Sequence, residues 1–156
     1  MNKEIERKYL IGGDFRPFVE SSTHIRQGYI AREGGRTVRV RTRDGKAYLT
    51  IKGPSDETGL GRDEWEIEIS MGDALQLMPL CQNGFIDKTR HIVPFGGHIF
   101  EIDEFHGDNE GLIFAEVELA DAFESVSLPS WIGEEVTGDR KYYNSHLLTH
   151  PYKDWK

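Results

Sequence analysis

Charged and apolar residues alternate in five separate segments of this chain, and this alternation constrains its fold more than any other feature. Side chains on a β-strand point alternately to its two faces, so each segment would have one charged face and one apolar face. The segments are EIERK at 4–8, RVR at 39–41, EWEIEI at 64–69, EID at 101–103 and EVE at 116–118. The pattern predicts an α+β protein that is mainly antiparallel β.

Turn signals between the alternating segments divide the chain into eight expected strands. Helical spacing is rarer, and Pro79 is expected to kink or end the middle of three short helices. With 156 residues and neither repeats nor a linker, residues 1–156 are predicted to form a single domain. The strands are expected at 3–11, 24–32, 36–43, 46–53, 62–70, 85–94, 98–106 and 113–119, and the helices at 15–20, 73–81 and 139–148.

Two tight turns predict which side chains lie opposite one another. The Asp-Gly pair in RDGK at 43–46 indicates a two-residue turn, which pairs Arg39 with Thr50. The Gly-Gly pair in FGGH at 95–98 similarly pairs Arg90 with Asp103. The resulting faces carry Arg39, Arg41 and Lys52 on one hairpin and Lys88, Arg90, Glu101 and Asp103 on the other.

The turn in EGGR at 33–36 has two alternatives. A two-residue turn at 34–35 would place Tyr29 on the face away from the arginines, whereas a three-residue loop at 33–35 would set Tyr29 opposite Arg39. The residues alone leave both open.

Two arrangements of the charged faces fit the alternation. An antiparallel sheet with its apolar face on the core and its charged face in water shows the same pattern. Like charges two residues apart, as in Glu66 and Glu68, are unfavourable in such a sheet. The alternative is a closed barrel whose charged faces line the inside, with helices covering the apolar outer face. Because unpaired buried charge is costly, this lumen would need a ligand such as a polyphosphate with a divalent metal.

Composition excludes several other classes of function. The net charge of −8 argues against non-specific nucleic-acid binding, which needs a surplus of Lys and Arg. No apolar run reaches the length of about 20 residues that spans a bilayer, and charge begins at Lys3 where a signal peptide would be apolar, so a cytoplasmic protein without membrane contact is expected. The single Cys81 has no disulfide partner, and the six histidines lack zinc-site spacing.

The charged segments also resemble a known family. EIERKYL at 4–10 matches the ExExK signature of the CYTH superfamily, the triphosphate tunnel metalloenzymes. The resemblance implies a closed eight-stranded antiparallel β-barrel, a triphosphate tunnel that binds its ligand with Mg²⁺ or Mn²⁺. Further segments follow in the family's order along essentially the whole chain: QGY at 27–29, VRVR at 38–41, LTIKG at 49–53, EWEIEI at 64–69, KTR at 88–90, EIDEF at 101–105, AEVEL at 115–119 and EVTGDRKYYNSHL at 135–147.

The resemblance also implies roles for individual residues. Tyr29 matches a tunnel tyrosine of the short bacterial members, which favours the three-residue loop at 33–35. The implied phosphate-binding residues are Lys8, Arg39, Arg41, Lys52, Lys88 and Arg90. The implied metal ligands are Glu4, Glu6, Glu66, Glu68, Glu101, Asp103, Glu116 and Glu118. The implied catalytic residues are Glu4, Glu6, Lys8 and Tyr29.

The implied function is a metal-dependent hydrolase that cleaves a phosphoanhydride bond of a small-molecule triphosphate. Similarity to the short bacterial members puts inorganic triphosphate first among the substrates. Thiamine triphosphatase, RNA 5′-triphosphatase, class IV adenylyl cyclase and a non-catalytic polyphosphate- or nucleotide-binding module are the alternatives. No nucleic-acid partner is expected, and a homodimer is left open.

Overall fold

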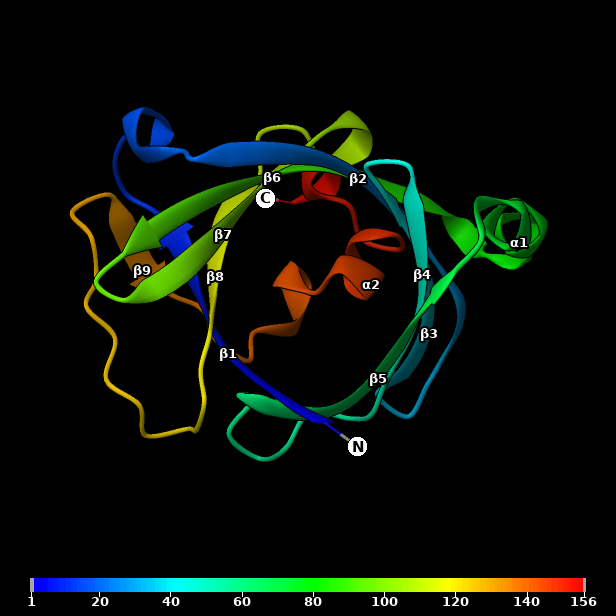
Figure 1. The fold of residues 1–156 in the computed structure, drawn as a ribbon, viewed down its shortest axis with the longest axis horizontal. Coiled ribbons are helices and arrows are strands. Elements are labelled where there is room, and N and C mark those ends of the chain that lie inside the picture. The colour runs from blue at the N-terminus through cyan, green and yellow to red at the C-terminus, as the bar shows by residue number, and fades with distance from the viewer. Residues whose placement is uncertain (1, 156) are drawn as a thin grey trace.

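A computed structural model describes residues 2–155, which form a closed antiparallel β-barrel with short helices at its ends and sides (Figure 1). Pairing of β5 with β1 closes the ring of eight strands, and β9 (Ile132–Glu135) pairs with the end of β1. The described residues include no helix that is long and apolar enough to cross a membrane. The barrel strands are β1 (Asn2–Ile11), β2 (Ser21–Glu33), β3 (Arg36–Arg43), β4 (Lys46–Lys52), β5 (Gly61–Ile69), β6 (Gln82–Phe95), β7 (His98–Phe105) and β8 (Ile113–Glu118).

The eight predicted strands are confirmed, whereas the helices are shorter than expected. The predicted helix at 73–81 is present as α1 (Met71–Leu77) followed by the 3-10 turn η2 (Met78–Leu80), which contains Pro79. The predicted helices at 15–20 and 139–148 were too long, because each stretch holds only single turns. These turns are η1 (Arg16–Phe18), η4 (Arg140–Tyr142) and α2 (Asn144–Leu147), and the other short elements are η3 (Gly107–Asn109) and η5 (Tyr152–Asp154).

The pairing predicted from the two tight turns is confirmed, since Arg39 lies opposite Thr50 and Arg90 opposite Asp103. The three-residue loop favoured at 33–35 is wrong, because Glu33 pairs directly with Arg36 across a two-residue turn. Tyr29 nevertheless lies opposite Arg39. A register shift between Tyr29 and Ala31 supplies the extra residue, so a bulge within β2 restores the alignment that the turn alone would not give.

The apolar outer face of the barrel is covered on two sides. Beside β7, β8 and β1, Trp131 packs against the rings of Phe15 and Phe100 in a buried cluster. On the other side, α1 covers part of β3 and β4. The expectation that helices cover the apolar outer face holds only in part, because Trp65 and Ile67 on β5 remain 43% and 46% exposed.

Inside the barrel, the charged lining gives way to an apolar cluster at one end. Phe105 and Phe114 are each two residues from a predicted site carboxylate on the same strand, so they share its inward face. Both are fully buried and pack with Tyr142 and Leu147 from the C-terminal segment. Figure 1 shows α2 lying within the outline of the ring. The C-terminal segment therefore occupies part of the interior and limits the space left for a ligand.

Candidate active site

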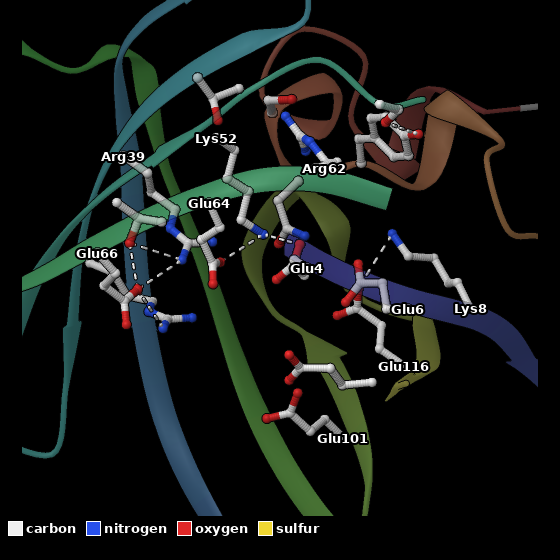
Figure 2. A pocket seen from close by; sticks show the side chains of 18 of the residues that line it. Glu4, Glu6, Lys8, Arg39, Lys52, Arg62, Glu64, Glu66, Glu101 and Glu116 are labelled. Carbon is white, nitrogen blue, oxygen red and sulfur yellow. Dashed lines mark hydrogen bonds and ion pairs between the residues drawn. The ribbon is translucent and has the colours of Figure 1, made fainter. Parts of the chain in front are cut away.

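The barrel interior contains a cavity of about 230 Å³ into which charged side chains from opposite strands project (Figure 2). The strand alternation that the sequence predicts thus places the charged faces inward rather than in water. Of the residues proposed from the sequence, the cavity lining includes Glu4, Glu6, Lys8, Tyr29, Arg39, Arg41, Lys52, Glu66, Lys88, Arg90, Glu101, Glu116 and Glu118.

Two predicted metal ligands lie outside this lining. Glu68 is exposed near the end of β5. Asp103 is fully buried behind the cavity wall, where its carboxylate contacts Lys88 and Arg90. The position of neither residue supports direct metal ligation from the cavity.

The arginines of β3 form the most cationic wall. Arg39 and Arg41 are only 9% and 8% exposed, and each has one terminal nitrogen less than 4 Å from Oε2 of Glu66, at 3.7 and 3.6 Å. Thr50 links two of these groups, because it accepts a hydrogen bond from Arg39 at 3.2 Å and donates one to Glu66 at 2.6 Å. Burial and the charges of Arg39 and Arg90 lower the pKa of Arg41 to about 9. A wall on which positive charge is this crowded favours an anionic ligand.

Hydrogen bonding on this wall is also incomplete. Among the described residues, the Nε atoms of Arg39 and Arg41 are buried and have no hydrogen-bond partner. A guanidinium presents its N–H groups as a fork that matches two oxygens of a phosphate or carboxylate. Unpaired buried donors are costly, so these groups are poised for a ligand rich in acceptor oxygens.

The acidic wall is formed by β1 and β8, on which Glu6 lies opposite Glu118 and Lys8 opposite Glu116. Burial and the negative charges of Glu116 and Glu4 raise the pKa of Glu6 well above its ordinary value. Burial acts in the same direction on Glu116, but the charge of Lys8 and a hydrogen bond from Glu6 outweigh it and lower the pKa of Glu116 to about 2. The pKa values of these two neighbouring carboxyl groups are thus driven apart, and the ionised form of Glu6 is the stronger base of the two.

One lysine joins the two walls. Nζ of Lys52 lies 2.7 Å from Oε1 of Glu4 and 3.7 Å from Oε2 of Glu64, as the dashed lines in Figure 2 show. Burial raises the pKa of Glu4, but the charge of Lys52 outweighs it, so the pKa is lowered and Glu4 is ionised at neutral pH. Glu4 is therefore a charged oxygen donor at the edge of the cavity.

Several cavity residues were missed by sequence reasoning. The backbone carbonyl oxygen of Tyr142 accepts a hydrogen bond from Nζ of Lys8 at 3.2 Å. Oδ1 of Asn144 accepts one from Nζ of Lys88 at 3.0 Å. These contacts bring the C-terminal segment onto two of the predicted phosphate-binding lysines. No alternation or motif marks this segment, so its similarity to the family's C-terminal stretch was the only available signal. The cavity residues missed by sequence reasoning include Tyr143 and Asn144 of this segment, and also Thr50 on β4 and Arg62 on β5.

The donor set fits a divalent cation that shares its ligands with a phosphate. Within residues 2–155, no three Asp, Glu, His or Cys side chains converge on one point as a complete metal cage would require. Mg²⁺ commonly binds through one or two carboxylates together with substrate phosphates and water, so a full protein cage is not needed. Burial and the negative charges of Glu116 and Glu4 raise the pKa of Glu6, and a bound cation would compensate those charges.

Comparisons with known proteins agree with this geometry. A family model described as CYTH domain matches residues 2–146. The chain is 45% identical to an inorganic triphosphatase of Acetivibrio thermocellus, over 100% of this chain and 99% of that protein. It is 34% identical to an inorganic triphosphatase of Nitrosomonas europaea, over 92% of this chain and 95% of the relative.

The fold is similar to that in a crystal structure of an inorganic triphosphatase, with a TM-score of 0.65 and 31% sequence identity over 93% of this chain and 97% of that one. Sequence, strand topology and the charged interior thus lead to the same assignment. The chain belongs to the CYTH domain family.

Proposed function

We propose that this protein hydrolyses inorganic triphosphate to diphosphate and phosphate, with Mg²⁺ or Mn²⁺ as its cofactor. The observation that carries the proposal is the cationic wall, where Arg39 and Arg41 hold buried Nε donors without partners among the described residues. Triphosphate is a linear anion rich in acceptor oxygens and would supply the missing acceptors. The two relatives reported above are named inorganic triphosphatases, which supports the same substrate.

The lining of the cavity favours triphosphate over its organic esters. Nearly all of the lining side chains are charged or polar, and the main exceptions near the cavity are Tyr29, Leu60 and Tyr143. Sites for drug-sized and cofactor-sized molecules are mostly apolar or aromatic, with only a few polar groups. A purine or thiamine ring would therefore find few favourable contacts within the charged part of the tunnel.

The proposed mechanism combines positioning with electrostatic stabilisation. Arg39, Arg41 and Lys52 bind the phosphate oxygens and stabilise the charge that develops on the leaving diphosphate. Lys8, Tyr29, Lys88 and Arg90 lie in the same lining and add further donors. When bound, the divalent cation neutralises phosphate charge and lowers the pKa of a water ligand.

Glu6 is the proposed proton acceptor. Because its pKa is raised, the ionised form of Glu6 is a stronger base than an ordinary carboxylate, and Glu6 faces the cavity from β1. The oxygen of water attacks the terminal phosphorus, the bond from that phosphorus to the bridging oxygen breaks, and its electron pair leaves with diphosphate. The water proton passes to Oε of Glu6, which releases it to solvent before the next turnover.

A panel of substrates tests the proposal. Purified protein is assayed for phosphate release from triphosphate, thiamine triphosphate and ATP, and for cyclic AMP formation from ATP, each with Mg²⁺ and with Mn²⁺. We expect the highest kcat/KM with triphosphate and no cyclic AMP. Preference for thiamine triphosphate, or formation of cyclic AMP, would replace the proposed substrate by one of these alternatives. Tight triphosphate binding without release from a folded protein would make this a binding module.

A further inference from the structure

Asp103 is the most enclosed carboxylate near the cavity, and both of its oxygens are engaged. Oδ1 accepts a hydrogen bond from Nε of Arg90 at 2.8 Å, while Oδ2 accepts one from Nη2 of Arg90 at 2.9 Å and another from Nζ of Lys88 at 2.7 Å. The side chain of Asp103 has 0% exposure, and that of Lys88 has 1%. Arg90 therefore meets Asp103 through a two-point fork, the most restrictive geometry available to this pair.

A count of the remaining donors shows what this arrangement leaves free. A lysine ammonium has three donors, and Lys88 directs two of them to Asp103 and to Oδ1 of Asn144. Arg90 uses its Nε edge for Asp103, and its Nη1 lies 3.4 Å from Oε2 of Glu101. Both cations still line the cavity, so their remaining donors are the ones available to a ligand.

The contacts of Asp103 differ from those of the acidic residues that face the cavity. Glu4, Glu6 and Glu116 all belong to the lining, whereas Asp103 lies behind Lys88 and Arg90. A metal ion in the cavity would have to displace two hydrogen-bonded cations to reach its oxygens. Burial alone would favour the protonated carboxyl, but the charges of Arg90 and Lys88 outweigh it and hold the pKa of Asp103 far below its ordinary value.

We propose that Asp103 is a positioning residue of the triphosphate site, which orients Lys88 and Arg90 toward the phosphates, and that it is not a metal ligand. This inference rests on the proposed function and identifies how two of the six proposed phosphate-binding cations are held. A lysine and an arginine have many rotamers, and fixing them before the ligand arrives reduces the entropy lost on binding. One buried carboxylate on β7, which contacts two cations of β6, supplies that order.

Metal-free binding separates the two roles of Asp103. The probe is inorganic triphosphate in EDTA, titrated into wild-type protein and into Asp103→Asn by isothermal titration calorimetry. A positioning role predicts that the variant binds at least tenfold more weakly, because Arg90 loses its fork and Lys88 loses its shorter contact. A metal ligand has nothing to hold in EDTA, and loss of its negative charge would leave the affinity for an anion unchanged or higher. Equal or tighter binding by Asp103→Asn would overturn the proposal.

Glu104 provides the matched control, because it is next to Asp103 on β7, but its carboxylate contacts Arg16 and His91 and it is not part of the cavity lining. Glu104→Gln is expected to bind metal-free triphosphate as tightly as the wild type. An equal loss of affinity in Glu104→Gln and Asp103→Asn would also overturn the proposal, since any disturbance of β7 would then suffice.

A second variant keeps the test decisive if Asp103→Asn does not fold. Asp103→Glu retains the charge but moves the carboxylate by one methylene, so the fork on Arg90 is misaligned. We expect at least threefold weaker metal-free binding, whereas a smaller loss would contradict a positioning role. Failure of the proposed function is recognised separately, because wild-type protein would then bind no triphosphate or release no phosphate from it.

Discussion

Nζ of Lys52 lies 2.7 Å from Oε1 of Glu4, and both side chains are only 14% exposed. This ion pair links β4 to β1, the two strands that flank β5, close to where pairing of β5 with β1 closes the barrel. One partner is a predicted phosphate-binding cation and the other a predicted metal ligand. In the free protein they neutralise each other, so under the proposed function binding of the metal and triphosphate would exchange this pair for two new ones.

Replacing Glu4 tests the acidic half of that exchange. Glu4→Gln keeps the size of the side chain but removes a charged oxygen donor, so turnover of triphosphate should fall by about 100-fold or more. The metal concentration needed for half-maximal rate should rise by about tenfold or more. Phosphate release measured across a series of Mg²⁺ concentrations gives both values. Glu110→Gln, which changes an exposed loop carboxylate, is the control and should match the wild type. Unaltered metal dependence in Glu4→Gln would remove this residue from the metal site.

Replacing Glu6 should reveal a cost in stability that the proposed catalysis imposes. Burial and the charges of Glu116 and Glu4 raise the folded-state pKa of Glu6 above its value of 4.5. Between pH 4.5 and that higher pKa, the unfolded chain releases a proton that the folded protein retains, so the free energy of unfolding falls as pH rises. Glu6→Gln removes this loss, which amounts to about 1.4 kcal/mol for each unit of pKa shift.

Urea unfolding in EDTA at pH 4 and pH 8 measures this effect. We expect the free energy of unfolding of Glu6→Gln, relative to that of the wild type, to be higher at pH 8 than at pH 4. The triphosphatase activity of the variant should be largely lost. A difference in stability that is the same at both pH values would show that the pKa of Glu6 is not raised in the folded protein.

Arg41 should not tolerate lysine. Its Nε is buried without a partner among the described residues, and its guanidinium lies near Glu66 and Arg39. Lysine offers a single charged point in place of a planar fork, so Arg41→Lys loses a charge-assisted hydrogen bond to triphosphate. We expect KM for triphosphate to rise by about tenfold, which corresponds to a loss of about 1.4 kcal/mol in binding free energy. Steady-state kinetics measure this effect. Arg36→Lys, at an exposed turn position, is the control. Equal KM values in both variants would show that the cavity does not use the fork of Arg41.

Two glycines offer a matched test of the close contact between Gly59 and Gly138, which both line the cavity. Gly59 and Gly45 have nearly the same backbone angle, with φ of +75° and +76°, in the left-handed region that favours glycine. A Cβ on Gly45 would meet nothing within 4 Å, whereas one on Gly59 would lie 2.7 Å from Cα of Gly138. Gly45→Ala should therefore lower the free energy of unfolding only by the backbone strain of about 1–2 kcal/mol, and Gly59→Ala should lower it further.

Thermal unfolding measures the loss of stability in both glycine variants. The Tm is expected to fall by about 2–4 °C for each kcal/mol lost in a domain of this size. Gly59→Ala should also raise KM, because Gly59 and Leu60 line the cavity. Equal thermal shifts would show that the contact between Gly59 and Gly138 is not tightly packed.

Alternation and tight turns were sufficient to predict the barrel strands and the pairing of Arg39 with Thr50. Both signals are local, because side-chain direction has a period of two and a two-residue turn fixes the register. Whether the charged faces meet solvent or line a lumen cannot be predicted from local signals, because it depends on the pairing of β1 with β5, which are far apart in sequence. Family resemblance supplied that information.

The features that were missed depend on tertiary contacts. β9 is only four residues long and reads IGEE, so it lacks alternation and is a strand only because the end of β1 has a free edge. The bulge after Tyr29 likewise leaves no mark in the sequence. Sequence placed Asp103 on the charged face correctly, but whether it meets a metal or two cations depends on the lengths of Lys88 and Arg90, which reach it from the neighbouring strand.

We propose that the tunnel hydrolyses triphosphate at its terminal phosphorus. The decisive measurement is phosphorus NMR of triphosphate incubated with the protein and Mg²⁺ in ¹⁸O-labelled water. We expect equal amounts of diphosphate and phosphate, with the label only in phosphate, and a much slower reaction with Glu6→Gln. Triphosphate that stays intact in the presence of folded wild-type protein and either metal would rule out hydrolysis, and a label that appears in diphosphate would rule out attack at the terminal phosphorus.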